Sequence, residues 1–318
     1  MITREHIHAF DDEALQVFAE KGTQAGTAIP QQGNANAVKV RRIMQLTRDL
    51  TGKSFHRLRI LDLACGEGVY SIEAALGGAE VVAIDGRTER MNDGIAIAQR
   101  AGLMRLKFEQ GDIRAVTRET HGAFDVVYVL GILYHLEGDA ACRTLENIRA
   151  MTDGLVIIDT HVALEGTGAL EYRGRRYAGA QHREHEDADS EAVRKARLLM
   201  SLDNTYSFWF TRESLARLLV DVGFTSVGEV YAPLEPDKPD QRATFVATAG
   251  ERVKVSAYPW VNELSEDAIT EKLRRQKARG LEQIASSPDR QSITAAGLVN
   301  GVLRRTLGVE LRRVARQH

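Results

Sequence analysis

The stretch Leu61-Asp62-Leu63-Ala64-Cys65-Gly66-Glu67-Gly68 decides the fold of this chain. Together with Arg59 and Ile60 before it, the apolar beginning of the stretch predicts a short buried strand that breaks into a turn with two glycines. Because glycine has no Cβ, such a turn lets backbone amides approach a ligand closely, and the following helix directs its positive end there. The stretch therefore predicts a strand, a ligand-binding turn and a helix in succession.

The rhythm of strand and helix continues beyond this stretch. Further short apolar runs occupy residues 79–84, 106–108, 124–129 and 155–158. Stretches of helical length lie between them, at residues 69–76, 89–101 and 139–151. Continuous apolar strands that alternate with helices are typical of a parallel sheet covered on both faces, and right-handed crossovers make such a fold doubly wound. We expect an α/β domain.

After the fifth strand, a polar insert at residues 162–210 interrupts the alternation. It contains a hairpin centred on Gly174 and a charged run at 182–191, which we expect to be a solvated, mobile segment rather than a zinc site. Thr211 then caps a helix, and strands at 227–231 and 244–248 form a closing hairpin. The prediction is a mostly parallel, seven-stranded sheet with a terminal antiparallel hairpin.

Three parts are expected along the chain: a helical N-terminal extension at residues 1–57, the α/β domain at 58–250, and a basic helical appendage at 251–318. The extension has a Gly- and Pro-containing interruption at 22–36 and is predicted to form a lid over the ligand. The appendage carries 13 Lys and Arg against 8 Asp and Glu. Its amphipathic pattern at 303–314 suits packing on the chain's own body, a homodimer contact or peripheral association with an anionic membrane.

Composition limits the classes of partner. The hydrophobic share of 43% and charged share of 27% are typical of soluble globular proteins, and the net charge of -2 offers no basic surface that would make nucleic acid an expected partner. Two cysteines, Cys65 and Cys142, cannot form a disulfide framework. The sequence begins without the apolar core of a signal peptide and has no integral membrane segment, so we expect a cytoplasmic location.

Acidic residues follow the predicted strands at ligand-binding positions. Asp85 ends the second strand, where a carboxylate can accept both hydroxyls of a ribose, and Asp112 follows the third, where it can meet an adenine edge. Asp62 precedes the glycine turn and suits an ammonium group better than a pyrophosphate. A nucleotide-like ligand is therefore expected, and Asp62 and the closing hairpin argue against a dinucleotide.

Taken with Ala83-Ile84-Asp85-Gly86, Gly111-Asp112-Ile113 and the run at 124–131, the opening stretch resembles the successive motifs of class I S-adenosylmethionine-dependent methyltransferases over residues 58–250. The resemblance implies S-adenosylmethionine as cofactor and S-adenosylhomocysteine as product. In that family the glycine turn lies against the methionine part, the second-strand acid grips the ribose and the third-strand acid borders the adenine. The implied cofactor residues are Asp62, Ala64, Cys65, Gly66, Gly68, Asp85, Gly86, Asp112, Ile113 and Leu130. Ala64 stands where many members carry a glycine.

The ends of strands four and five supply candidate catalytic residues. Methyl transfer needs an aligned acceptor, and a hydroxyl acceptor usually needs a base. His135 and His161 follow these strands and are candidates for that base, because histidine titrates near neutral pH. Asp159 is a candidate for orienting a histidine. No dense set of metal ligands accompanies it, so we predict no metal.

The insert supplies candidate acceptor-binding residues, since insertions after strand five commonly build the acceptor cap in this family. Arginines and tyrosines there could clamp an anionic or sugar-like group. The candidates are Tyr134, Tyr172, Arg173, Arg176, Tyr177, Tyr206 and Trp209. At least one of the three aromatic residues 208–210 is expected in the core.

The leading functional hypothesis is methyl transfer to a small molecule, with a hydroxyl of a sugar or natural product as acceptor. Two alternatives remain open. The run at 130–135 also resembles tRNA wobble-uridine carboxymethyltransferases, although the acidic balance outside the appendage disfavours RNA. The other alternative is a cofactor-binding protein without catalysis.

Overall fold

The computed structural model describes residues 35–232 and 238–265, together with 267, 268, 271 and 275. Residues 1–34 of the expected lid at 1–57 lie outside the described residues, and the amphipathic tail at 303–314 lies wholly outside them. The chain divides into two units, at residues 1–252 and 253–318. In the described part, no helix is both long and apolar enough to cross a membrane.

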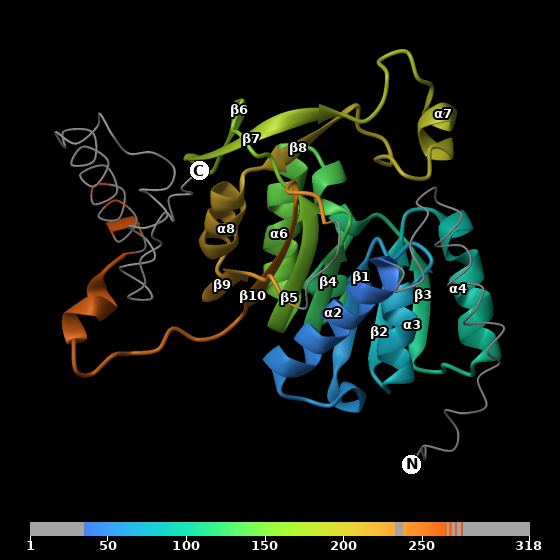
Figure 1. The fold of residues 1–318 in the computed structure, drawn as a ribbon, viewed down its shortest axis with the longest axis horizontal. Helices are drawn as coiled ribbons and strands as arrows, with labels where there is room; N and C mark the ends of the chain where they lie inside the picture. Colours follow the sequence, from blue (N-terminus) through green and yellow to red (C-terminus); the bar gives the residue numbers. More distant parts are fainter. Residues whose placement is uncertain (1–34, 233–237, 266, 269–270, 272–274, 276–318) are drawn as a thin grey trace, which may run out of the picture. The chain divides into compact units, whose positions relative to one another are not determined.

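A seven-stranded sheet forms the centre of the first unit (Figure 1), in the order β3-β2-β1-β4-β5-β10-β9. Its strands are β1 (Arg59–Leu63), β2 (Glu80–Asp85), β3 (Leu106–Gln110), β4 (Phe124–Leu130), β5 (Thr152–His161), β9 (Ser226–Glu229) and β10 (Arg242–Thr248). The first five pair in parallel, whereas β10 runs antiparallel to both β5 and β9. The predicted doubly wound sheet with a closing hairpin is confirmed.

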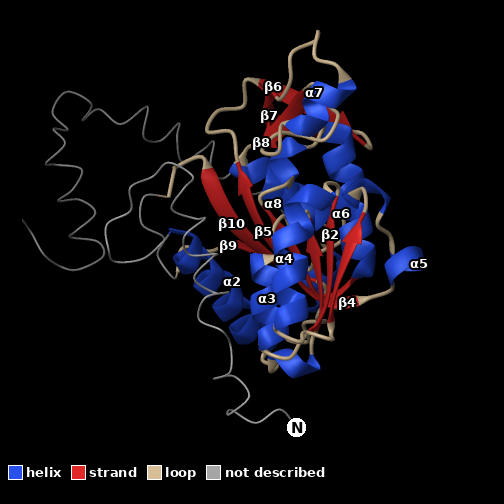
Figure 2. Cartoon of the chain, turned by 90° about the vertical axis from the view of Figure 1, so that its right-hand side faces the viewer, coloured by secondary structure: helices blue, strands red, loops and turns tan. Residues whose placement is uncertain are grey.

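Helices cover both faces of this sheet (Figure 2). They are α2 (Ala35–Thr51), α3 (Val69–Leu76), α4 (Thr88–Arg100), α5 (Arg118–His121), α6 (Gly138–Met151) and α8 (Arg212–Asp221). Alternate residues of a strand face opposite sides, so β4 feeds two cores. Val126 and Tyr128 pack in the core that contains residues of α2 and α3, whereas Val127 and Val129 pack in the core of α6 and α8.

Helix α2 belongs to this core, although its residues fall in the predicted N-terminal extension. Ile43 is fully buried, and the Thr47 hydroxyl lies 2.8 Å from the hydroxyl of Tyr128 in β4. The buried Arg42 donates a hydrogen bond to Thr244 of β10. The helix therefore completes one face of the sheet.

The insert after β5 forms a second, three-stranded antiparallel sheet of β6 (Gly168–Tyr172), β7 (Arg175–Arg183) and β8 (Tyr206–Phe210), with helix α7 (Glu191–Ala196) between β7 and β8. The predicted hairpin is confirmed, because Tyr172 pairs with Arg175 across Arg173 and Gly174. The prediction of core aromatic residues at 208–210 is also confirmed by two buried phenylalanines.

The expected solvated run at 182–191 is exposed at most positions, but the structure corrects the prediction at two of them. Glu184 and His185 are buried, with 4% and 1% of their surfaces exposed. The backbone of Glu184 donates to the carbonyl of Thr205, which extends the pairing of β7 with β8. Charge alone misled here, because hydrogen-bonding groups from elsewhere in the fold surround the two side chains.

Candidate active site

A cavity of about 400 Å³ opens at the carboxyl ends of the parallel strands. Its walls come from Ala64 after β1 and from the segments 85–87, 111–114 and 130–136 after the next strands. The insert closes it with residues 198–204, which we call the strap. Ligands of doubly wound sheets bind at this edge, and the volume suits a small molecule.

The turn after β1 is built on left-handed backbone. Ala64, Gly66 and Gly68 have φ angles of 57°, 56° and 75°. A Cβ at Gly68 would lie 2.6 Å from the Phe108 ring, so the position has no room for a side chain. Ala64 adopts the same backbone conformation at a cost of about 1 kcal/mol, as expected for a residue that replaces a glycine. The tight turn keeps its backbone near the pocket.

Asp85 fixes this turn to the end of β2. Its carboxylate accepts hydrogen bonds from the backbone amides of Gly66 and Arg87, each at 2.9 Å. A carboxylate offers about four acceptor positions, so two remain for a ligand in the pocket that Asp85 lines. Gly86 lies beside the strap, because a Cβ there would be 3.2 Å from Leu202.

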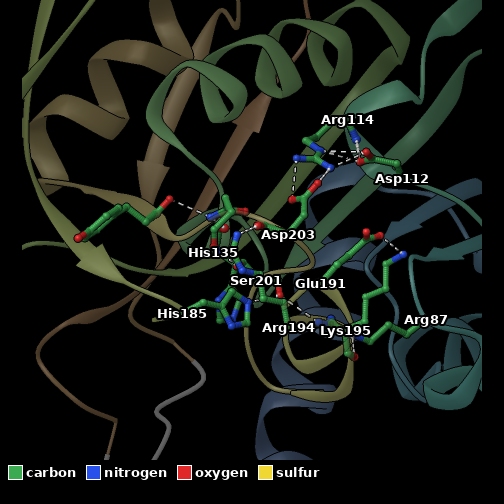
Figure 3. Close-up of polar contacts among 12 residues, drawn as sticks. Arg87, Asp112, Arg114, His135, His185, Glu191, Arg194, Lys195, Ser201 and Asp203 are labelled. Carbon is green, nitrogen blue, oxygen red and sulfur yellow. Dashed lines mark hydrogen bonds and ion pairs between the residues drawn. The ribbon is translucent and has the colours of Figure 1, made fainter. Parts of the chain in front are cut away.

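Asp112 connects the end of β3 to the strap through an arginine (Figure 3). Arg114 Nε lies 2.9 Å from both carboxylate oxygens of Asp112, and its other nitrogens pair with Asp203 at 3.0 and 2.7 Å. Burial disfavours the charge of Asp112, but the hydrogen bonds from Arg114 hold its pKa below the usual range. Ile113 and Leu130 add apolar surface to the same pocket.

Four of the implied cofactor residues, Asp62, Cys65, Gly66 and Gly68, do not line this cavity. Asp62 is 1% exposed and accepts a hydrogen bond of 2.6 Å from the Ser71 hydroxyl. Burial, with a smaller contribution from Asp85, raises the pKa of Asp62 to about 7 although Ser71 opposes the shift. Burial likewise raises the pKa of the Cys65 thiol. Asp62 therefore supports the turn from beneath by holding the first turn of α3.

The pocket fits the implied cofactor. Asp85 suits the hydroxyls of a ribose, Ile113 and Leu130 suit the faces of a base, and Ala64 brings the start of the turn after β1 to the cavity wall. Arg87 and Arg90 also line the cavity, at the start of α4. S-adenosylmethionine would bring a sulfonium-bound methyl group to the acceptor side.

His135 lies at the acceptor side of the pocket, in the 3-10 turn η4 (Leu133–His135). Its Nδ1 is 2.8 Å from the carboxylate of Glu184, and the two side chains are only 15% and 3% exposed. Burial opposes ionisation of Glu184, but the hydrogen bond and charge of His135 and two further donors hold the pKa of Glu184 below its usual range. An ionised carboxylate only accepts, so Nδ1 carries the hydrogen.

His161 lies beside the cavity in an aromatic group and does not line it. Its ring stacks on Trp209 with centroids 4.9 Å apart and meets the edge of Tyr134 at 4.6 Å. Burial, followed by the positive charge of Arg242, lowers the pKa of His161 to about 4. His161 is therefore neutral at pH 7. Both candidate histidines contact Tyr134, since the His135 ring lies 4.2 Å from the Tyr134 ring.

Asp159 forms a buried ion cluster. It accepts hydrogen bonds from Arg242 Nε at 2.6 Å and from the Thr244 hydroxyl at 2.8 Å. Lys39 and Lys238 approach within 3.7 and 3.8 Å. Burial disfavours the ionised form, but Arg242 and Lys39 hold the pKa of Asp159 below its usual range. Its role toward a histidine stays a prediction, because its hydrogen bonds go to β10.

Three candidate acceptor residues of the insert are engaged with helices. The Tyr172 hydroxyl and Arg173 both donate to Glu146 of α6, at 3.0 and 2.9 Å. The Tyr177 hydroxyl donates to Asp221 of α8 at 2.8 Å. They lie outside the cavity wall, as do the other insert candidates.

Those other candidates are Arg176 on β7 and Tyr206 and Trp209 on β8. Trp209 lies close to the site, since its indole donates to the carbonyl of Tyr134, which itself lines the cavity. Tyr206 is 40% exposed, with the Arg183 guanidinium 5.7 Å from its ring. Tyr134 thus contacts His135, and Trp209 contacts Tyr134.

The strap and its anchors are functional features that sequence reasoning missed. Arg87 donates to the backbone carbonyls of Lys195, Arg197 and Ser201, at 3.2, 3.2 and 3.0 Å. Figure 3 labels Arg87, Lys195 and Ser201. Arg90 donates to the carbonyl of Leu198. The acceptors are main-chain carbonyl groups, which every residue type carries, so the sequence does not indicate them. Only the two arginines just after Asp85 could have drawn attention.

Comparison with known proteins agrees with this geometry. Residues 54–198 match the family model described as a methyltransferase domain. A glycine/sarcosine N-methyltransferase of Aphanothece halophytica is 27% identical over 194 residues, which cover 57% of this chain and 73% of that protein. A glycine/sarcosine/dimethylglycine N-methyltransferase of Actinopolyspora halophila is 26% identical over 195 residues, or 56% of this chain and 34% of that protein.

An O-methylating relative is also similar, over a shorter span. The ubiquinone biosynthesis O-methyltransferase of Acinetobacter baumannii (strain AYE) is 27% identical over 114 residues, which cover 35% of this chain and 46% of that protein. The chain therefore spans less than half the length of some of the curated relatives it matches. Among solved structures, the N-terminal domain of EvdMO1, crystallised with SAH and D-fucose, superposes with a TM-score of 0.54 at 19% identity and covers 77% of this chain and 99% of that domain. That likeness is one of fold.

Proposed function

We propose that this chain, whose residues 54–198 match a methyltransferase domain, methylates a hydroxyl group of a small molecule with S-adenosylmethionine as the methyl donor. One observation carries the proposal. His135 lines the pocket beside the strand-end residues and is held through Nδ1 by the buried, ionised Glu184. A hydroxyl acceptor must lose a proton as it attacks the methyl group, and the pair of His135 and Glu184 is suited to accept that proton.

The hydrogen bond to Glu184 determines which nitrogen of His135 can act. Because Nδ1 carries the hydrogen, the neutral ring presents Nε2 as the acceptor. Nε2 takes the proton of the acceptor hydroxyl, and the nearby carboxylate stabilises the resulting imidazolium. His161 is less suited to this step, since burial and Arg242 keep its basicity low.

The surroundings of His135 favour a small, hydroxyl-bearing acceptor. The aromatic group of Tyr134 and Trp209 lies next to it, and aromatic side chains commonly pack against sugar rings and natural products. The strap lines the same pocket. The EvdMO1 domain was crystallised in the presence of D-fucose, which makes deoxysugars and other monosaccharides the first acceptors to test.

The proposal is tested by release of S-adenosylhomocysteine in the presence of an acceptor panel. The panel contains monosaccharides, nucleotide sugars and phenols, with glycine and sarcosine as amine acceptors. We expect turnover with a hydroxyl acceptor, and we expect His135→Asn to lower kcat by about 10²- to 10⁴-fold while S-adenosylhomocysteine still binds. His121→Asn, at a histidine outside the pocket, serves as the matched control.

Two results would contradict this function. Turnover confined to glycine or sarcosine would assign the chain to N-methylation, the activity named for two of its relatives. Full activity of His135→Asn with a hydroxyl acceptor would remove His135 from the role of base.

A further inference from the structure

The buried carboxylate of Glu184 is bonded by three donors from three parts of the chain. Oε2 accepts from His135 Nδ1 at 2.8 Å and from the Ser201 amide at 2.9 Å, and Oε1 accepts from the Ser207 hydroxyl at 2.8 Å. Hydrogen bonds to a charged group are strong, and together they offset the desolvation of a carboxylate that is 3% exposed. One oxygen therefore joins the candidate base to the strap.

The strap is held on its other side by separate contacts. The carbonyl of Ser201 accepts from Arg87 Nη2 at 3.0 Å and lies 2.9 Å from His185 Nε2 (Figure 3). Asn204 Nδ2 donates to the backbone carbonyl of His135 at 3.0 Å. The strap thus reaches from the residue after Gly86, on the cofactor side, to the backbone of the base.

We propose that Glu184 is the positioning residue of His135, and that the strap completes the pair because its Ser201 amide donates a hydrogen bond to the shared carboxylate oxygen. The inference rests on the proposed function, because it concerns the base of that reaction. When the strap lies over the pocket, Ser201 fixes the Glu184 carboxylate, and the carboxylate fixes the imidazole ring. When the strap is displaced, the ring loses its orientation. Proton removal is thereby coupled to closure of the cofactor pocket.

The pair is testable by pH. Among the described residues, Glu184 is the acidic partner of His135, Tyr134 and His161 also face it, and Arg242 lies beyond the Tyr134 ring. Loss of the carboxylate charge destabilises an imidazolium, so the acidic limb of the kcat profile moves to lower pH. A purely structural role for Glu184 would leave that limb in place.

The first experiment compares Glu184→Gln with the wild type in the acceptor assay. We expect kcat to fall by about 10- to 100-fold and the acidic limb of its pH profile to move to lower pH by about one unit or more. The affinity for S-adenosylhomocysteine should stay within about twofold of wild type. Glu184→Asp keeps the charge and should restore the position of the limb. Glu186→Gln is the matched control, because Glu186 is two residues away and exposed.

A second measurement does not depend on the folding of a Glu184 variant. Nitrogen-15 NMR of histidine side chains in the wild-type protein reports the tautomer of His135, assigned by its loss in His135→Asn. We expect the Nδ1–H tautomer, and the Nε2–H tautomer would overturn the proposal. If His135→Asn abolishes turnover while Glu184→Gln changes neither kcat nor the acidic limb, Glu184 is not the positioning residue and the proposed function stands. If His135→Asn is fully active, the proposed function itself fails.

Discussion

The buried carboxyl of Asp62 makes stability depend on pH in an unusual direction. Most carboxyl groups of folded proteins have lowered pKa values, so they favour the folded state above pH 4. Burial instead raises the pKa of Asp62 from 3.8 to about 7. The folded protein therefore holds this proton more tightly than the unfolded chain. The contribution of Asp62 to stability is greatest below pH 4 and is lost as the pH rises toward 7.

The size of the effect follows from the shift. Each pKa unit corresponds to about 1.4 kcal/mol, so the ionised carboxylate costs the folded state about 4 kcal/mol once the pH exceeds 7. Between pH 5 and pH 8 the loss is about 3 kcal/mol. Asp62→Asn removes the titration but keeps an oxygen that can accept from Ser71. The stability of Asp62→Asn relative to wild type should therefore rise by about 3 kcal/mol between pH 5 and pH 8.

Urea denaturation followed by circular dichroism measures this difference at pH 5, 6.5 and 8. Comparison of the two proteins at each pH cancels the other titrating groups. Asp49→Asn, at an exposed carboxylate of α2, should show no comparable trend. A difference that stays constant with pH, or that grows toward pH 5, would refute the reasoning.

Three further predictions follow from neighbouring contacts. Asp85→Ala should weaken S-adenosylhomocysteine binding by about 10- to 100-fold in calorimetry, with NAD as the control ligand, because a charged hydrogen-bond acceptor is lost; unchanged affinity would contradict the site. Asp159→Ala should lower the free energy of unfolding by about 3–5 kcal/mol at pH 7, since it leaves the buried Arg242 without its carboxylate partner. Because the pKa of Asp159 is lowered in the folded state, the wild type should lose this contribution as the pH falls below about 4. Gly94→Ala should lower the melting temperature despite the better helix propensity of alanine, because the new Cβ would collide with the Glu67 carbonyl; a higher melting temperature would show that the turn yields.

The strands and helices of the main sheet could be predicted because parallel strands are buried on both faces and read as continuous apolar runs. Helix α3 begins and ends where the pattern placed it. Strand β5 is longer than its apolar core at 155–158, since its first residue pairs with β4 and its last three pair with β10, and this pairing gives no local signal. Propensity therefore located the strand, and tertiary pairing set its length.

The acceptor side was less predictable for a related reason. Glu184 looks like one acidic residue in a charged run, and its burial depends on donors 49 positions earlier and 17 and 23 positions later. Asp159 was a candidate for orienting a histidine because it nears the end of a strand. It pairs across to Thr244 instead, so its side chain belongs to the sheet's own ion cluster. The residue types indicated the chemistry of the site, but only the packing of the fold determines which residue takes which role in it.

The two ends of the insert lie side by side. Ala163 and Thr211 form a bridge, and the amide of Ala163 donates to the carbonyl of Phe210 at 2.9 Å. A segment whose exit and return are adjacent can be exchanged as a cassette, since the entropy of closing a loop changes slowly with its length. Chimeras that swap the residues between these two positions for those of a relative would keep the sheet and transfer the acceptor preference.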